Sequence, residues 1–145
     1  MSLDGDYDPD NIFAKIVRGD MPAAKVFEDH ETFAFMDAFP QGPGHTLVVH
    51  KTAHSRNLLD IEPEPLSALI LTVQRVSRAV VAAMKPEGLL VTQFNGAPAG
   101  QTIFHLHFHI IPRWRQIPLG RHAGAAMADL GELTKQAHKI AAELS

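Results

Sequence analysis

The chain has 145 residues, the length of one domain, and its 46% hydrophobic and 20% charged residues exclude intrinsic disorder. A formal net charge of -3 argues against electrostatic binding to bulk nucleic acid, and the absence of cysteine excludes disulfides, thiolate metal ligands and a cysteine nucleophile. No apolar run approaches the roughly 20 residues of a membrane span, so we expect a cytoplasmic protein without membrane contact. Residues 10–145 are expected to form a single domain, preceded by a flexible tip over residues 1–9.

The first third of the domain predicts one short helix and three short strands. Asp10 is a candidate N-cap for a helix over residues 11–18, and Gly19 suits the left-handed position that follows it. Three runs of strand-forming residues come next, separated by turn residues, at 25–28, 32–37 and 45–50. This alternation predicts an antiparallel meander.

The rest of the chain predicts two more helices and two more strands. Over residues 63–85 the apolar side chains recur at spacings of three and four, which indicates a long helix. Strands are predicted at 89–95 and 105–111, joined by a Gly/Pro/Ala loop at 96–100. A weaker apolar stripe predicts a last helix at about 123–144. Together these elements give an α+β domain.

Residues 105–111 read HLHFHII, in which imidazole alternates with large apolar side chains. Because a strand has a period of two, His105, His107 and His109 are predicted to project from one face, at Cα spacings of about 6.6 Å. A lone histidine in a strand is usually structural. Three histidines on one face of a strand bury less apolar area than valine or isoleucine would bury at the same positions. We therefore interpret them as imidazoles that line a cleft.

Two chemistries use such a row of histidines. Alternate imidazoles can ligate zinc with an open fourth position, or one imidazole can act as a nucleophile without a metal. In the preceding loop, small residues let the backbone approach a ligand, and Asn95, Gln101 and Thr102 supply uncharged donors. This composition suits a phosphate, although a Gly/Pro/Ala connector alone is more often structural.

The HLHFHII motif resembles the signature of the histidine triad (HIT) family of nucleotide hydrolases and transferases. Segments at 11–29, 33–49 and 95–101 are similar to the family's opening helix and first strand, its second and third strands, and its phosphate loop. The resemblance covers residues 11–113 in order. It implies a five-stranded antiparallel sheet with a short N-terminal helix, one long helix and a C-terminal helix, and a homodimer joined sheet edge to sheet edge.

The resemblance also implies a reaction that needs no cofactor and no metal. His107 would attack the α-phosphorus of a purine nucleotide conjugate, such as a nucleoside phosphoramidate or a dinucleoside polyphosphate. The resulting covalent nucleotidyl-histidine would be resolved by water or another acceptor. His109 and Gln101 would hold phosphate oxygens with help from Asn95, and Thr102 would lie near the leaving group.

Four more residues would complete the site by resemblance. His45 and His105 would support the nucleophile. Asp37 would accept hydrogen bonds from the ribose hydroxyls, and Phe13 would flank the base. From the residues alone, Asp37 and His45 are ordinary turn residues.

The sequence departs from the family pattern at two places. Many bacterial members hold a structural zinc through two cysteines near the first helix and two histidines. Asn11 and Ala14 stand at the cysteine positions, so no tight tetrahedral zinc site is expected, although His54 remains at one histidine position and His105 at the other. His50 stands where the family has proline, and no function is assigned to it.

Two alternatives to covalent catalysis by His107 stay open. One is a zinc-dependent hydrolase with His105, His107 and His109 as ligands. The other is a non-catalytic nucleotide-binding module, against which the intact central histidine argues. The sequence does not determine the leaving group or the base.

Overall fold

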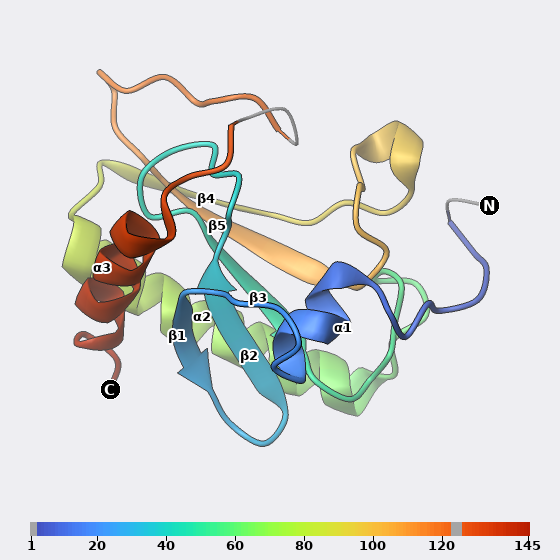
Figure 1. Ribbon diagram of the computed structural model, residues 1–145. Coiled ribbons are helices and arrows are strands. Elements are labelled where there is room, and N and C mark those ends of the chain that lie inside the picture. Colours follow the sequence, from blue (N-terminus) through green and yellow to red (C-terminus); the bar gives the residue numbers. More distant parts are fainter. Residues whose placement is uncertain (1–2, 123–125) are drawn as a thin grey trace.

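The computed structural model describes residues 3–122 and 126–145, a part that contains three α-helices, one 3-10 helix and five strands. In chain order these are α1 (Ile12–Val17), β1 (Lys25–Glu28), β2 (Thr32–Met36), β3 (Thr46–His50), α2 (Pro63–Met84), β4 (Gly88–Thr92), the 3-10 helix η1 (Ala97–Ala99), β5 (His107–Arg113) and α3 (Leu130–Ala141). The strands form one antiparallel sheet in the order β1-β2-β3-β5-β4 (Figure 1). The predicted α+β class, with five antiparallel strands and three helices, is confirmed.

α1 is shorter than predicted and has a different N-cap. The side chain of Asn11 accepts a hydrogen bond from the Ala14 N–H at 3.0 Å, so the cap is Asn11 and not Asp10. Asp10 instead forms a salt bridge with Arg18, in which Oδ1 lies 2.9 Å from Nη2. Gly19 has a φ of 87° and adopts the expected left-handed conformation after the helix.

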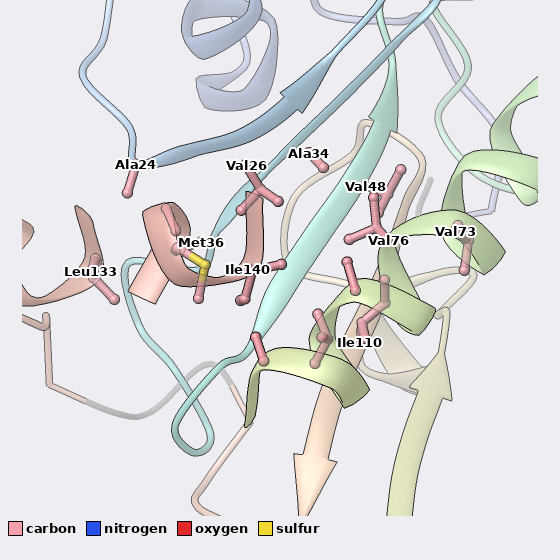
Figure 2. Close-up of a cluster of buried hydrophobic side chains, with 14 of the residues drawn as sticks. Ala24, Val26, Ala34, Met36, Val48, Val73, Val76, Ile110, Leu133 and Ile140 are labelled. Atoms are coloured by element: carbon pink, nitrogen blue, oxygen red, sulfur yellow. The ribbon is translucent and has the colours of Figure 1, made fainter. Parts of the chain in front are cut away.

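α2 and α3 cover one face of the sheet and enclose the main hydrophobic core (Figure 1, Figure 2). The period-two alternation of the strands sends Ala34, Val48 and Ile110 to this face, where Figure 2 shows them close to Val73 and Val76 of α2. The buried residues of α3 are Leu133, Ala137 and Ile140. Each fully buried valine or isoleucine side chain stabilises the fold by about 1.5–3 kcal/mol. The apolar stripe predicted for the long helix is therefore its packing face.

The opposite face of the sheet carries α1 and the histidines of β5. Phe35 of β2 packs there against Phe13 of α1, with ring centroids 5.4 Å apart. The pairing of β3 with β5 places Leu47 opposite His109, and paired residues of neighbouring strands point to the same face. His107 lies two residues before His109 and shares this face. The strand register thus brings the histidines to the α1 side.

β5 is shifted by two residues from its predicted position and ends at Arg113, and β4 is shorter than predicted. The chain bends at residues 103–105, so β5 begins at His107 and His105 lies before the strand. The prediction that three histidines project from one strand is therefore wrong for His105. β4 ends at Thr92, because the residues after it form the loop that leads to η1.

α3 begins later than predicted. Asp129 is its N-cap, with Oδ2 accepting the Glu132 N–H at 3.1 Å, so the helix starts at Leu130. Residues 126–129 are not helical, and the predicted start at 123 lies outside the described residues.

α2 is a long helix with a high apolar content, interrupted by Arg75 and Arg78. It has 22 residues and a mean hydropathy of 1.4 in its most apolar window, so among the described residues it is long and apolar enough to cross a membrane. In this fold, however, one side of α2 forms the core with the sheet. Arg75 of α2 lies 4.6 Å from the ring centre of Phe27 in β1. The core position explains the buried stripe of α2, whereas Ile70, Leu71 and Val81 are exposed apolar side chains on its outer side.

Candidate active site

A cavity of about 480 Å³ lies on the α1 face of the sheet. Six residues predicted for the site line it together: Phe13, Asp37, His45, Thr102, His107 and His109. Three others, all within the described part of the chain, lie outside its lining: Asn95, Gln101 and His105. The cavity is large enough for a small organic ligand and combines apolar walls with a few polar groups.

His45 and His109 form a hydrogen-bonded pair whose tautomers are determined by a backbone donor. The Gln41 N–H donates to Nδ1 of His45 at 2.9 Å, so the proton of the neutral ring is on Nε2. This Nε2–H donates to Nδ1 of His109, also at 2.9 Å. The neutral His109 ring therefore carries its proton on Nε2, which is buried and has no hydrogen-bond partner in the described part of the chain. An unpaired buried donor costs about 1–3 kcal/mol, which an oxygen of a bound ligand would offset.

His107 presents a lone pair beside this unpaired donor. Its Nδ1–H donates to the carbonyl oxygen of His105 at 2.7 Å, so the lone pair of the neutral ring is on Nε2. The ring of Phe13 contacts it edge-on, with centroids 4.8 Å apart, and the His109 ring lies 4.9 Å away on the same face. The backbone thus determines that the lone pair of the neutral His107 ring is on Nε2.

Burial controls the ionisation of the site. It lowers the pKa of His45 to about 3 and that of His109 to about 2. It also lowers the pKa of His105 and His107 to about 4. All four rings are therefore neutral at pH 7, and each keeps one lone pair.

Asp37 follows β2 and reaches the same cavity. Its Oδ1 accepts the Phe39 N–H at 2.8 Å, and its Oδ2 lies 3.4 Å from Nε2 of His45. Burial raises the pKa of Asp37 to about 6, so the group is mainly ionised at pH 7. The carboxylate is an acceptor available to a ligand hydroxyl.

Both ring nitrogens of His105 form hydrogen bonds, and one of the partners, Tyr7, was not predicted from the sequence. Its Nε2–H donates to the His50 carbonyl at 3.1 Å, and the hydroxyl of Tyr7 donates to its Nδ1 at 2.8 Å. The Tyr7 ring is also stacked on His54 with centroids 5.0 Å apart. No spacing signal marks Tyr7, which lies in the segment expected to be a flexible tip; that flexibility stays a prediction. The support predicted for the nucleophile is consistent with this contact, since the carbonyl of His105 holds His107.

Gln101 organises the loop before β5. Its Oε1 accepts the Gly96 N–H at 2.8 Å, and its Nε2 donates to the carbonyls of Arg56 at 2.7 Å and Ile103 at 3.0 Å. Both donor positions of the amide are thus used inside the protein. The predicted contact of Gln101 with a phosphate stays a prediction.

Asn95 also bonds within the protein, whereas Thr102 faces the cavity. Oδ1 of Asn95 accepts the Leu58 N–H at 2.9 Å, and its amide exchanges hydrogen bonds with the side chain of Gln93. Asn95 therefore connects the loop after β4 to the loop before α2. Its predicted role on the phosphate, and that of Thr102 near a leaving group, stay predictions.

His50, to which the sequence assigned no function, stabilises a turn through its side chain. Its Nδ1 accepts the N–H groups of Thr52 at 3.2 Å and Ala53 at 3.1 Å, which closes the turn after β3. Its own carbonyl accepts from His105. A proline at this position could not make the side-chain contacts.

His122 is a cavity residue that the sequence analysis missed. It lies in the segment between β5 and α3 and lines the cavity. Its Nε2–H donates to the Gly100 carbonyl at 2.5 Å, and its ring lies 4.6 Å from Phe94 and 5.5 Å from His109. Only the tertiary fold brings this loop residue to the site, so no sequence period could reveal it.

The hydrogen bonds of the site do not suit a resident metal. Asp37, His45 and His109 are the group of possible ligands found among the described residues, with ligand atoms within 4.8 Å of one another. Nδ1 of His45 accepts a backbone N–H, so the neutral ring has no lone pair left on Nε2. Both ring nitrogens of His105 are engaged as well, which argues against a zinc site of His105, His107 and His109.

The position of the family's structural zinc also does not fit. The Asn11 side chain caps α1, and Ala14 offers no ligand. Tyr7 contacts both His54 and His105 and links them where the metal would. The tyrosine thus takes over the connection between the two histidines.

Comparison with known proteins identifies the family. The HIT domain model matches residues 18–117. A Hit-like protein of Bartonella henselae, described as involved in cell-cycle regulation, has 46% sequence identity and a TM-score of 0.87 over 95% of this chain and 99% of that one. A zinc-bound histidine triad family protein of Mycobacterium smegmatis has 29% identity and a TM-score of 0.78 over 92% of each chain. Adenylylsulfatase HINT3 of Arabidopsis thaliana is 37% identical over 120 residues, which span 79% of this chain and 60% of that protein. The chain therefore belongs to the HIT-domain family of nucleotide-binding hydrolases and transferases.

Proposed function

We propose that the protein cleaves a purine nucleotide conjugate at its α-phosphate through a covalent nucleotidyl intermediate on His107. The observation that carries this proposal is that a ring nitrogen with a lone pair and a ring N–H donor belong to neighbouring histidines on one face of β5. Nε2 of His107 holds a lone pair because Nδ1 donates to a carbonyl, and Nε2 of the neighbouring His109 is an unpaired buried donor. A nucleophile beside a donor for a phosphate oxygen is the arrangement that phosphoryl substitution requires.

The reaction has two balanced steps. The lone pair on Nε2 of His107 attacks the α-phosphorus, and the bond to the leaving group breaks with its electron pair. The Nε2–H of His109 stabilises the charge on a non-bridging oxygen. Water then attacks the phosphorus and expels the imidazole, so His107 returns to its starting state. The proton that the water loses balances the electron pair that the leaving group took in the first step. Another acceptor in place of water gives a transferase.

The remaining cavity residues support binding of the nucleoside. The carboxylate of Asp37 is placed to accept hydrogen bonds from ribose hydroxyls, and Phe13 provides an apolar surface for the base. Asn95 and Gln101 shape the phosphate loop, and Thr102 lies at the cavity wall for contact with the leaving group. No cofactor takes part in the scheme.

A homodimer completes the proposal. β4 is the edge strand next to β5, and its side chains are exposed on both faces, Leu90 to 37% and Val91 to 43%. An unpaired edge with apolar side chains invites pairing with another strand. We propose that β4 pairs across a two-fold axis, which extends the sheet through the dimer.

The test is a labelling experiment with a panel of adenylated and guanylated substrates, including phosphoramidates, dinucleoside polyphosphates and adenylyl sulfate. Enzyme mixed with a nucleotide-labelled substrate is quenched in alkali within milliseconds. Wild type should carry the label and His107→Ala should not. Labelling of His107→Ala at the wild-type level would overturn the proposal, and wild type without turnover on any member would favour a non-catalytic module.

The zinc-hydrolase alternative has its own discriminating measurement. Activity on the same panel should survive strong chelation nearly unchanged, since His107 needs no metal to attack. A loss that zinc alone restores would instead establish the alternative mechanism. The protein for this measurement must be purified without a histidine tag.

A further inference from the structure

His122 occupies a defined place in the cavity, although it lies beyond the residues that the family model matches. The segment that carries it is anchored upstream by Gly120, whose N–H donates to the Gln41 carbonyl at 2.7 Å and whose carbonyl accepts from the Gln41 side chain at 3.1 Å. A Cβ added to Gly120 would lie 2.9 Å from the Gln41 carbonyl oxygen, so only glycine permits this close approach. His122 itself bonds to Gly100 in the phosphate loop. The segment thus links the loop before β3 to the loop before β5.

Four aromatic rings form a continuous series through the site. Their centroids lie 4.8 Å apart from Phe13 to His107, 4.9 Å from His107 to His109 and 5.5 Å from His109 to His122. Phe13 is the apolar end, where the base is proposed to bind, and His107 and His109 surround the α-phosphate. His122 stands at the other end of the series, beside the phosphate loop. This is the end at which a group attached beyond the α-phosphate would lie.

The other ionisable groups in the described cavity lining are less suited to protonate a leaving group. Asp37, whose pKa burial raises to about 6, lies beside Nε2 of His45 at the part of the cavity proposed for the ribose. Burial lowers the pKa of His45, His107 and His109 far below 7, so these rings are neutral and do not supply a proton readily. Imidazole is the side chain that both gives and takes protons near neutral pH. His122 uses Nε2–H on Gly100, which leaves Nδ1 for contact with a ligand.

We propose that His122 contacts the leaving group and protonates it, so that cleavage of conjugates with basic leaving atoms depends on this residue and cleavage of conjugates with acidic leaving groups does not. This inference rests on the proposed function of His107. The step starts from the imidazolium form of His122, which keeps its Nε2–H on the Gly100 carbonyl and carries a second proton on Nδ1. As the bond between the α-phosphorus and the leaving nitrogen breaks, its electron pair stays on nitrogen and takes the Nδ1 proton, which leaves His122 neutral. The water that resolves the nucleotidyl-histidine loses a proton to His122, which restores its initial state.

The test compares two adenylates that differ only in the leaving group. One is the adenosine 5′-phosphoramidate of an alkylamine, whose nitrogen must be protonated to leave. The other is the p-nitrophenyl ester of AMP, whose leaving oxygen needs no proton. His122→Ala should lower kcat/KM for the phosphoramidate by about 10²-fold or more, the usual contribution of a general acid, and leave the ester unchanged. His122→Gln should behave in the same way, because its amide can donate to Gly100 but carries no acidic proton.

The control and the opposite outcomes separate the two proposals. His138 lies on the exposed side of α3 outside the cavity lining, and His138→Ala should match wild type on both substrates. Equal losses on both substrates, or no loss on either, would overturn the role of His122 while the nucleotidyl mechanism stands. Wild type that cleaves neither substrate and takes up no label would instead reject the proposed function and the inference with it. If His122→Ala fails to fold, the comparison is carried by His122→Gln.

Discussion

The hydroxyl of Tyr7 donates a hydrogen bond to Nδ1 of His105 at 2.8 Å. Through this contact the N-terminal segment holds the residue whose backbone carbonyl orients His107. The contact keeps the proton of His105 on Nε2, which donates to His50. The carbonyl of the same His105 accepts from Nδ1 of His107. Residues near the N-terminus are therefore coupled to the ring that we propose as nucleophile.

Tyr7→Phe should reduce stability without removing the stacking on His54. The substitution leaves Nδ1 of the buried His105 without its donor, and an unsatisfied buried acceptor costs about 1–3 kcal/mol in the free energy of unfolding. Urea denaturation measures the change. Thr134→Val is a matched control, because it removes a hydroxyl whose hydrogen bond to Leu130 is exposed and should cost little. Equal stability of Tyr7→Phe and wild type would show that the contact is unimportant.

Substitution of the three triad histidines should give graded losses of activity. His107→Ala removes the nucleophile, so kcat should fall by at least about 10³-fold while substrate binding largely survives. His109→Ala removes a phosphate contact and should cost about 10- to 100-fold, or about 1.4–2.7 kcal/mol of transition-state stabilisation. His105→Ala should fall between them. Steady-state kinetics on one substrate gives the order, and a larger loss for His109→Ala than for His107→Ala would contradict the assignment.

The free energy of unfolding should fall as the pH drops from 7 to 5. In the folded state burial holds the pKa of His45, His105, His107 and His109 at about 2 to 4, below the value of 6.5 for the exposed ring. Between those values the unfolded chain binds more protons, so this stability is complete above pH 6.5 and is lost as the pH falls through the window.

Asp37 has the opposite effect on the pH dependence of stability, but it is one group against the four buried histidines. Its pKa is raised to about 6, so the stability that it contributes is present at low pH and is lost as the pH rises through 6. Urea denaturation at pH 7, 6 and 5 measures the net slope. His45→Gln should reduce the slope, whereas His138→Gln, on the exposed side of α3, should not. A stability that stays flat or increases toward pH 5 would contradict the neutral state of the buried rings.

The proposed dimer can be tested at the β4 edge. Sedimentation at micromolar concentration should give a mass twice the 15.9 kDa of one chain. Leu90→Lys combined with Val91→Lys places a charge on each face of β4 and should weaken association by about 10-fold or more, equivalent to about 1.4 kcal/mol. Met127→Lys is the control, since Met127 is 69% exposed and lies away from β4 in the chain before α3. A wild-type monomer would exclude the proposed assembly.

Features that depend on local periodicity could be predicted before the fold was known. The three-and-four spacing of apolar residues located α2, because an amphipathic helix must bury one side. The period of two placed His107 and His109 on one face of β5 and Ile110 on the other, as the register with β3 confirms. Together with the family resemblance of the HLHFHII motif, these patterns were sufficient for the fold and for six of the residues that line the cavity.

The loop residues that complete the site could not be predicted, because contacts between distant segments bring them together. His105 leaves the strand at a bend, where its ring meets Tyr7 and the carbonyl of His50, partners that lie 98 and 55 positions away in the sequence. His122 reaches the cavity because Gly120 lies against Gln41, a contact between segments 79 positions apart. Loop conformations depend on such distant hydrogen bonds and not on a repeating pattern. The sequence could therefore locate the proposed nucleophile, whereas the groups that orient its ring and the histidine proposed for the leaving group required the fold.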